Sequence, residues 1–229
     1  MLLFSGFKNG QSDIFIYSFL SRSILNITND FFDDFQPKFL HDQKKIIFSS
    51  NRNKDTIALK DNFYNIVPGS SYDLFIYNYI DKDPVLFRVT NTPSANENAV
   101  CEVSDKEIIF LSDESGITNR YLARFNSTIS KIDTVIHFVY LAKSFPLTDN
   151  AYSFFEQDYF KNSDSVASII LYKGSKRIYK TPLSLFPVNN ILLASAFKQQ
   201  LDYNKQINDS LNAIIKTKGK DAYSKYGFY

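Results

Sequence analysis

A serine nucleophile of the Ser-His-Asp type needs a histidine as its base, and this chain has two histidines, His41 and His137. His41 falls in a predicted surface turn, and His137 falls in the aromatic strand 136–140. The sequence contains neither a Gly-x-Ser-x-Gly elbow nor a phosphate-binding glycine loop. We therefore predict that neither histidine is catalytic and that the 229 residues hold no catalytic residue.

Acidic residues gather in two places that could bind a cation. Asp30, Asp33 and Asp34 form one cluster, and Asp81 and Asp83 form the other. Neither cluster has the glycine and the closing glutamate of a calcium loop, and no Cys or His pair has the spacing of metal ligands. We interpret both clusters as solvated turns and expect no metal and no cofactor.

The single cysteine and the net charge give no sign of a reactive thiol or of a strongly charged partner. Cys101 is the single cysteine, and it lies in an apolar stretch where a buried thiol is expected. The formal net charge is only +2, and the basic residues near the end are few and diluted: Lys216, Lys218, Lys220 and Lys225. A nearly balanced charge favours neither nucleic acid nor an anionic membrane surface as a partner.

The elements that must position these residues recur along the chain. The pentapeptides 13–17 (DIFIY) and 73–77 (DLFIY) are almost the same strand, and an apolar run recurs with centres at Phe4, Phe48, Phe110 and Leu171. The steps between these centres are 44, 62 and 61 residues, which indicates a period near 40 to 45 with later insertions. Such a period, with several short strands in each unit, is typical of propeller blades.

Threonines mark the ends of the repeats. Thr28 precedes Phe48 by 20 residues, and Thr90 precedes Phe110 by the same distance; a looser third copy begins at Thr148. Threonine at a strand end more often organises a turn through its hydroxyl group than contacts a ligand. We therefore interpret these positions as structural.

Turn residues divide the body into 14 predicted strands, and abundant Phe, Tyr and Ile suit a pleated surface. The predicted strands are 2–6, 13–19, 23–29, 35–40, 45–50, 73–79, 84–90, 97–103, 107–112, 119–125, 134–147, 151–158, 166–173 and 176–182. Residues 51–72 are an insertion between two of them. The sequence thus predicts an all-β partial β-propeller of about three and a half four-stranded antiparallel blades.

After Pro187 the apolar spacing becomes helical, which divides the chain into a propeller part, 1–187, and a C-terminal helical extension, 188–229. We expect one long helix over 189–217, capped by Asn189 or Asn190; the alternative is a helix broken near 203–208. Its apolar stripe either packs on a neighbouring domain or binds a partner.

The first complete copy resembles the repeat of TolB-type six-bladed propellers, and the similarity covers residues 1 to about 183. The matching positions are Thr28, Pro37, Asp42, Phe48, Ser50 and Arg52, with Thr90, Phe110, Ser112 and Thr148 in later copies. Two departures stand out. Residues 41–43 are His-Asp-Gln where the family usually has Pro-Asp-Gly, and Ala99 replaces the proline in the next copy. The last copy matches weakly.

The resemblance implies a non-enzymatic scaffold for protein contacts in the periplasm, partnered by envelope lipoproteins or peptidoglycan-associated proteins. It further suggests a fragment of a longer Bacteroidetes-type envelope protein. The alternative is the substrate-gating propeller of a prolyl-oligopeptidase-type peptidase, which carries the same repeat before its hydrolase domain. The sequence shows no signal peptide and no membrane-spanning stretch. Because the first copy lacks its first strand and the last lacks its fourth, we expect further blades or self-association.

Overall fold

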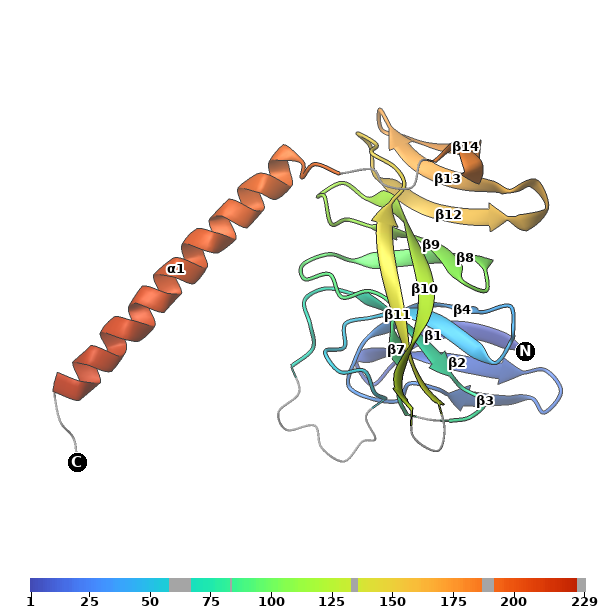
Figure 1. Ribbon diagram of the computed structural model, residues 1–229, viewed down its shortest axis with the longest axis horizontal. Coiled ribbons are helices and arrows are strands. Elements are labelled where there is room, and N and C mark those ends of the chain that lie inside the picture. Colours follow the sequence, from blue (N-terminus) through green and yellow to red (C-terminus); the bar gives the residue numbers. More distant parts are fainter. Residues whose placement is uncertain (58–66, 83, 133–135, 187–191, 226–229) are drawn as a thin grey trace. The chain divides into compact units, whose positions relative to one another are not determined.

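A computed structural model describes residues 1–57, 67–82, 84–132, 136–186 and 192–225, and side chains within 128–139, at 215 and from 217 onward are outside that description. The chain divides into two compact units, Met1–Leu192 and Leu193–Tyr229. The first unit contains all of the strands shown in Figure 1, and the second contains the helix α1. We describe each unit separately.

The first unit consists of four antiparallel sheets that follow one another in chain order, with 3, 4, 4 and 3 strands (Figure 1). Sheet A is β1-β2-β3, sheet B is β4-β5-β6-β7, sheet C is β8-β9-β10-β11 and sheet D is β12-β13-β14. The strands are β1 (Leu2–Lys8), β2 (Gln11–Ser18), β3 (Ser23–Asn26), β4 (Asp34–Phe39), β5 (Lys45–Ser50), β6 (Asp73–Asn78), β7 (Phe87–Arg88), β8 (Glu97–Ser104), β9 (Glu107–Ser112), β10 (Asn119–Ile132), β11 (Ile136–Pro146), β12 (Phe154–Phe160), β13 (Ser165–Tyr172) and β14 (Ser175–Pro182).

This arrangement confirms the predicted fold class. Each sheet is a simple meander, and β5 and β9, which carry the recurring apolar run, both occupy the second position of their sheets. Sheet A begins at the second strand of the repeat, and sheet D ends at the third. The predicted insertion 51–72 lies between β5 and β6, although residues 58–66 are outside the described part.

The core lies between consecutive sheets. Ile46 and Phe48 of β5 pack with Ile14 of β2 between sheets A and B, while Leu74 of β6 and Phe110 of β9 pack between sheets B and C. All five side chains are almost completely buried. A second strand that is flanked within its own sheet and covered on both faces by neighbouring sheets explains why the sequence reads there as a continuous apolar run.

One predicted equivalence is wrong. The repeat spacing placed Leu171 at the core position of Phe48, but Leu171 is 40% exposed, whereas Val166 of the same strand is fully buried between sheets C and D. Successive side chains of a strand point to opposite faces, so Leu171 and Val166, five residues apart, lie on opposite faces. An error of one residue in aligning a strand moves its buried side chains to the exposed face. The spacing of the last copy is too loose to determine this alignment.

The first strand of each complete sheet contains a bulge. Gln36 of β4 and Ala99 of β8 both have positive φ angles near +49°, and the pairing register shifts at these positions. The backbone N–H of Ala99 donates to Oε1 of Gln36 at 2.8 Å, which ties the two strands together. Pro37 follows the first bulge, a position where a strand tolerates proline.

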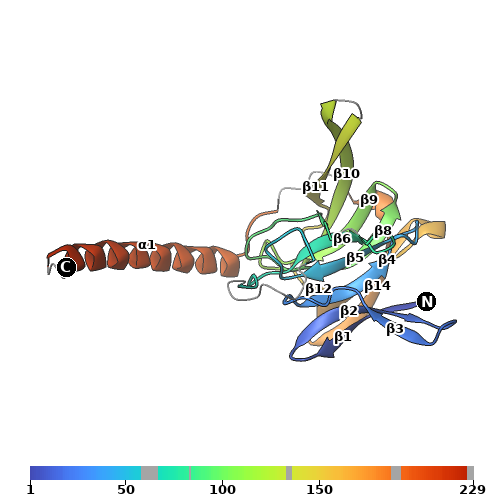
Figure 2. The same cartoon turned by 90° about the horizontal axis from the view of Figure 1, so that it is seen from below.

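Sheet C carries a long ribbon. β10 spans 14 residues and β11 spans 11, whereas the adjacent β9 has six. The two long strands remain paired from Tyr121–Pro146 to Ile132–Ile136, and Figure 2 shows them extending past the other strands. His137 lies in this ribbon, where its side chain is outside the described part.

The second unit is the single long helix that was expected. α1 (Ala196–Lys225) is continuous, without the alternative break near 203–208, and it begins seven residues after Asn189. The N–H of Lys198 donates to Oγ of Ser195 at 3.2 Å, which makes Ser195 the N-cap. The proposed caps Asn189 and Asn190 lie outside the described residues. Among the described helices, none combines the length and the apolar character that crossing a membrane requires.

Candidate functional site

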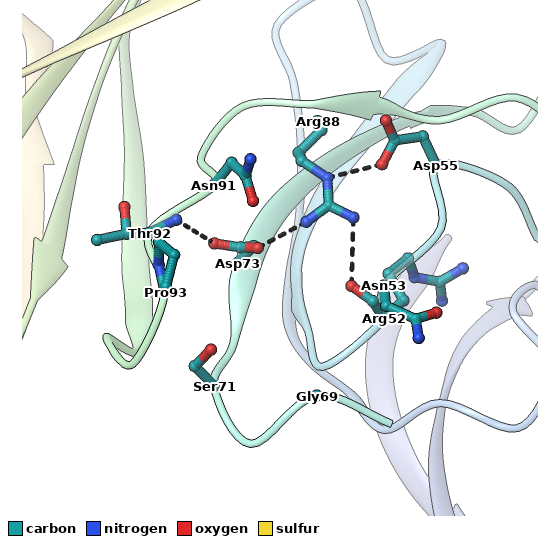
Figure 3. A pocket seen from close by; sticks show the side chains of 10 residues that line it. All are labelled: Arg52, Asn53, Asp55, Gly69, Ser71, Asp73, Arg88, Asn91, Thr92 and Pro93. Carbon is teal, nitrogen blue, oxygen red and sulfur yellow. Dashed lines mark hydrogen bonds and ion pairs between the residues drawn. The ribbon is translucent and has the colours of Figure 1, made fainter. Parts of the chain in front are cut away.

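An open cleft of about 510 Å³ lies where sheet B meets the connection to sheet C. Three chain segments line it: the start of the 51–72 insertion, its end at 69–73, and the linker 91–93 that follows β7. Figure 3 shows that Arg88 and Asp73 project between these segments. The cleft is therefore built from loops and strand ends that a rigid sheet holds in place.

Arg88 is held in place on all sides. Its Nε donates to Oδ1 of Asp55 at 2.6 Å, and one terminal nitrogen donates to Oδ2 of Asp73 at 2.7 Å (Figure 3). The other terminal nitrogen donates to the carbonyl oxygen of Arg52 at 3.3 Å, and the guanidinium carbon lies 4.6 Å from the centre of the Phe75 ring. These contacts fix the guanidinium and join the insertion to the strands β6 and β7.

Asp73 connects the cleft to the interior. Its Oδ1 accepts the N–H of Thr92 at 3.0 Å, which fixes the linker to sheet C. Behind it lies Glu97, which is 1% exposed and accepts a hydrogen bond from the hydroxyl group of Thr90 at 3.1 Å. Burial, and then the charge of Asp73, raise the pKa of Glu97 to about 8. Glu97 therefore holds a proton near neutral pH.

The cleft backs onto a buried ion cluster around Arg52. The guanidinium donates two hydrogen bonds of 2.8 Å to the carboxylate of Asp34 and one of 3.1 Å to Asp30, and its Nε donates to Oγ of Ser50 at 2.9 Å. The Arg52, Asp30 and Asp34 side chains have no exposed surface. The centre of the Phe48 ring lies 5.4 Å from the Arg52 guanidinium carbon.

The Arg52 cluster corrects one prediction. Asp30 and Asp34 are not in a solvated turn, because both carboxylates point inward to Arg52. Burial raises the pKa of Asp30 to about 7 and also raises that of Asp34, against the opposing attraction of Arg52. Asp81 is exposed, and Asp83 lies outside the described residues.

The repeat threonines make the same contact in three sheets. The hydroxyl oxygens of Thr28, Thr90 and Thr148 accept a backbone N–H from the strand of their own sheet that is the third of the repeat (β2, β6 or β10), at distances of 3.0, 2.8 and 2.9 Å. The residue before each threonine also donates its N–H to the carbonyl oxygen of that same strand residue, at 2.8 Å in every copy. These pairs fasten the fourth strand's end to its sheet.

Three further motif residues are buried or form the bonds of a turn. Phe110 and Ser112 are 1% exposed, and the hydroxyl group of Ser112 donates to Oε1 of Glu97 at 3.4 Å. Asp42 accepts the N–H groups of Lys44 and Lys45 at 2.9 and 3.1 Å, which closes the turn between β4 and β5. These motif positions support the strands and their turns.

Sequence reasoning missed Arg120. This residue is 1% exposed at the boundary of sheets C and D, where its Nε donates to Oε1 of Gln157 at 2.7 Å and a terminal nitrogen donates to Oγ of Ser168. Phe154 and Phe186 lie against the guanidinium, 5.0 and 4.8 Å from its carbon. Within the described residues no carboxylate pairs with Arg120, and burial lowers its pKa to about 10.

Two further reactive side chains, those of His41 and Cys101, lie apart from the cleft-lining residues. His41 lies at the surface, where its Nδ1 is 2.8 Å from Glu102 of the neighbouring sheet. Cys101 is buried beside Lys38, and burial raises its pKa. Among the residues that the structure describes, no three His, Cys, Asp or Glu side chains form a group that could hold a metal ion. The cleft residues can bind through hydrogen bonds and charge.

The chain is similar to several solved structures. No protein-family model matches the chain, and no curated protein sequence matches it. The crystal structure of TolB from Acinetobacter baumannii is similar over 82% of this chain, with a TM-score of 0.53 and 15% identity. Hydrazine synthase of Kuenenia stuttgartiensis covers 74% of the chain at a TM-score of 0.45 and 16% identity.

The likeness to TolB carries the fold and no more, because sequence identity is low. The chain spans 39% of the length of that TolB chain. Its four sheets follow one another as propeller blades do, and the repeat residues that resemble the TolB type lie at matching places in sheets A, B and C. The chain therefore has the fold of a part of a TolB-like β-propeller.

Proposed function

We propose that this chain is a non-enzymatic scaffold that binds a partner protein at the bacterial cell envelope, through the cleft at the junction of sheets B and C. The observation that supports it is the fixed polar cleft around Arg88, in which Asp55, Asp73 and the linker at Thr92 are already held in place. A site that is ordered before binding loses little conformational freedom when a partner arrives.

The open form of the cleft suits a protein partner. Asn91, Ser71 and Thr92 at its rim supply polar groups, and the Asp55 side chain is 55% exposed. Protein interfaces typically surround a few anchors with a polar, solvent-accessible rim of this kind. The TolB-like fold favours envelope lipoproteins or peptidoglycan-associated proteins as the partner class, and a periplasmic location.

The same likeness supports a longer parent protein. The chain spans 39% of the length of the TolB chain that it resembles, which fits a section of a larger propeller. The proposal that this propeller is of the Bacteroidetes-type envelope class rests on the sequence resemblance alone. The partner's surface would then extend over neighbouring blades.

A matched pair of substitutions tests the cleft. Ser71→Arg places a large side chain in the cleft, whereas Ser70→Arg adds the same group at the adjacent exposed position, which is not among the cleft-lining residues. Using a peptidoglycan-associated lipoprotein without its lipid as the probe, calorimetry should show binding to the parent and Ser70→Arg proteins and at least a tenfold loss for Ser71→Arg. Equal affinities, or no binding by the parent, would contradict the proposal.

Catalysis is tested separately. The purified chain should not hydrolyse proline-containing peptides or esters above the buffer rate. Saturable turnover that a single serine or histidine substitution abolishes would instead support a peptidase.

A further inference from the structure

The outer edge of sheet D is open. In sheets A, B and C the third strand of the repeat, β2, β6 or β10, pairs on its outer side with a fourth strand, β3, β7 or β11. β14 is the third strand of sheet D, and in the described part of the chain it pairs with β13 alone. The chain then turns inward, because Leu183 and Phe186 pack against the core between sheets C and D. Three sheets thus have an antiparallel strand at their outer edge. In sheet D no described strand occupies the same position.

The hairpin before β14 determines which backbone groups are free. Lys173 and Gly174 form a two-residue turn, and both have positive φ angles, 48° and 78°, as a type I′ turn requires. The residues that flank such a turn, Tyr172 and Ser175, exchange both of their backbone hydrogen bonds. Alternation along β14 then directs the N–H and C=O groups of Arg177 and Tyr179 to β13. Those of Lys176, Ile178 and Lys180 point to the open side.

This edge is positively charged. Lys176 and Lys180 lie on one face of β14 with Ile178 between them, and Ile178 is 77% exposed. No acidic residue occurs from Ser165 to Phe186, and none of the four cations Lys173, Lys176, Arg177 and Lys180 forms an ion pair within the described residues.

Aromatic rings hold two of these cations in place. The ammonium of Lys176 lies 5.4 Å from the centre of the Phe155 ring, and that of Lys180 lies 5.9 Å from the centre of the Phe160 ring. Both rings are exposed on sheet D. The two charges are thereby held beside the open edge.

The charge pattern disfavours a second copy of β14 as the occupant. Two β14 strands paired antiparallel about Ile178 would place Lys176 of one directly opposite Lys180 of the other. Like charges at directly opposed positions destabilise strand pairing. The open edge is complementary to a strand of the opposite charge.

We propose that the open edge of β14 binds an extended acidic segment of a partner protein, which adds to sheet D as an antiparallel fourth strand. The segment presents acidic, apolar and acidic side chains at alternate positions, opposite Lys180, Ile178 and Lys176. Backbone hydrogen bonds supply the binding energy common to all strands, and the two lysines select the acidic pattern. This surface is separate from the cleft, so the inference does not rest on the proposed function.

The test uses a labelled peptide, Thr-Glu-Thr-Val-Thr-Glu-Thr, and a second peptide with lysine in place of both glutamates. Fluorescence anisotropy should show saturable binding of the acidic peptide, weaker binding as salt is raised, and no binding of the basic peptide. Ile178→Pro removes an outward N–H without disturbing the β13 ladder, and proline is tolerated at such edge positions. It should lower affinity at least tenfold, whereas Ile178→Thr, which keeps the N–H, should change it less than threefold.

Several outcomes would overturn the proposal. Absence of binding, equal binding of both peptides, or full binding by Ile178→Pro would exclude strand addition. If Ile178→Pro fails to fold, an acidic peptide methylated at alternate backbone nitrogens replaces it, and undiminished binding of that peptide would be equally decisive. Binding of anionic vesicles or of an oligonucleotide that survives Ile178→Pro would show a general polyanion surface. A dimer that Ile178→Pro dissociates would show that the occupant is a second copy.

Discussion

Arg52 and Arg120 are both buried, yet the side chains around Arg52 are anionic and those around Arg120 are neutral. Arg52 faces the carboxylates of Asp30 and Asp34, and Arg120 faces the neutral side chains of Gln157 and Ser168. Charge pairing therefore offsets much of the desolvation of the first arginine, while hydrogen bonds and aromatic rings alone offset that of the second.

The repeat explains the difference at Arg120. The N–H of Arg120 bonds to Thr148 as those of Ile14 and Leu74 bond to Thr28 and Thr90, so the three residues occupy equivalent positions. Two copies place an aliphatic residue there and the third places a guanidinium. The junction of sheets C and D is therefore a polar variant of an apolar junction, and a propeller-type fold accepts both.

A second contrast concerns carboxylates. Asp34 pairs in register with Ser50, as Glu97 does with Ser112, so the two acids hold equivalent positions in sheets B and C. Two residues after Ser50 the chain has Arg52, but two residues after Ser112 it has Glu114. Glu97 therefore lacks the arginine that Asp34 has, and a bound proton neutralises it instead.

The largest effect should come from breaking the paired site. Arg52→Met leaves Asp30 and Asp34 buried without their cation, and removal of one partner from a buried ion pair costs about 3–5 kcal/mol. Urea unfolding should show this loss, and adding Asp34→Asn to Arg52→Met should restore part of it. A loss below about 1 kcal/mol would mean that the cluster contributes no more than a surface ion pair.

Stability should fall as pH rises from about 5 to 8. The folded-state pKa of Glu97, about 8, lies above its ordinary value of 4.5, and that of Asp30, about 7, lies above 3.8. The folded protein thus retains protons that the unfolded chain has released, so the stabilisation present at low pH is lost as pH rises through the folded-state pKa. Each such proton contributes a slope of about 1.4 kcal/mol per pH unit.

Glu97→Gln separates the two contributions to this slope. A series of denaturant titrations between pH 5 and pH 9 should give a shallower slope for this variant, with the part due to Asp30 remaining. The same slope in the parent and the variant would show that Glu97 does not hold the proton.

Removing the threonine hydroxyl group should lower the free energy of unfolding by the same amount in the sheet next to Arg52 and in the sheet next to Arg120. Thr28→Val and Thr148→Val keep the shape of the side chain but leave a buried backbone N–H without its acceptor, a loss of about 1–3 kcal/mol each. The matched Thr→Ser variants retain the hydroxyl group and should lose less. Unequal losses from the two valine variants, measured by thermal unfolding, would show that the repeat contact depends on the neighbouring arginine site.

The smallest effect should come from removing Arg120 together with Gln157, one of its two side-chain acceptors; the other acceptor, Ser168, keeps a hydroxyl group that can itself donate. Arg120→Leu alone leaves Oε1 of Gln157 buried without a donor, whereas Arg120→Leu with Gln157→Leu recreates the aliphatic pattern of the other copies. Replacing buried ionic groups by well-packed apolar ones is often neutral or stabilising. We expect the double variant to lie within about 1 kcal/mol of the parent or above it. If the double variant lost as much free energy of unfolding as Arg52→Met, the two arginine sites would not differ in energy as proposed.

Much of the fold could be predicted because the repeat records it locally. Strand positions follow from apolar runs and turn residues that lie within about ten residues of one another, and the threonine spacing showed which strands are equivalent. The last copy failed because its spacing is loose, so Leu171 was placed one residue out of register. The described helix begins at Ala196, directly after Ser195, whose Oγ accepts the N–H of Lys198, and the expected caps Asn189 and Asn190 lie outside the described residues.

The candidate site was much less predictable. Asp55, Asp73 and Arg88 belong to different segments, and no motif joins them in the sequence. A positional signal did exist at Arg120, since a charged residue stands where Ile14 and Leu74 stand in the other copies. That signal marks an unusual position without identifying what surrounds it.

By itself the sequence determined the repeat, the all-β class, most strand positions in sheets A to C and the presence of a C-terminal helix, because side-chain periodicity and turn chemistry act between near neighbours. The extension of β10 beyond the predicted 119–125 to Ile132 was missed. Only the tertiary structure decided which charges meet. Arg52 reaches Asp34 across 18 residues, Arg88 reaches Asp55 across 33, and Arg120 reaches Ser168 across 48. Whether a charged side chain is solvated or buried depends on the sheet that packs over it, and the packing of one blade on the next is not encoded in the period of either.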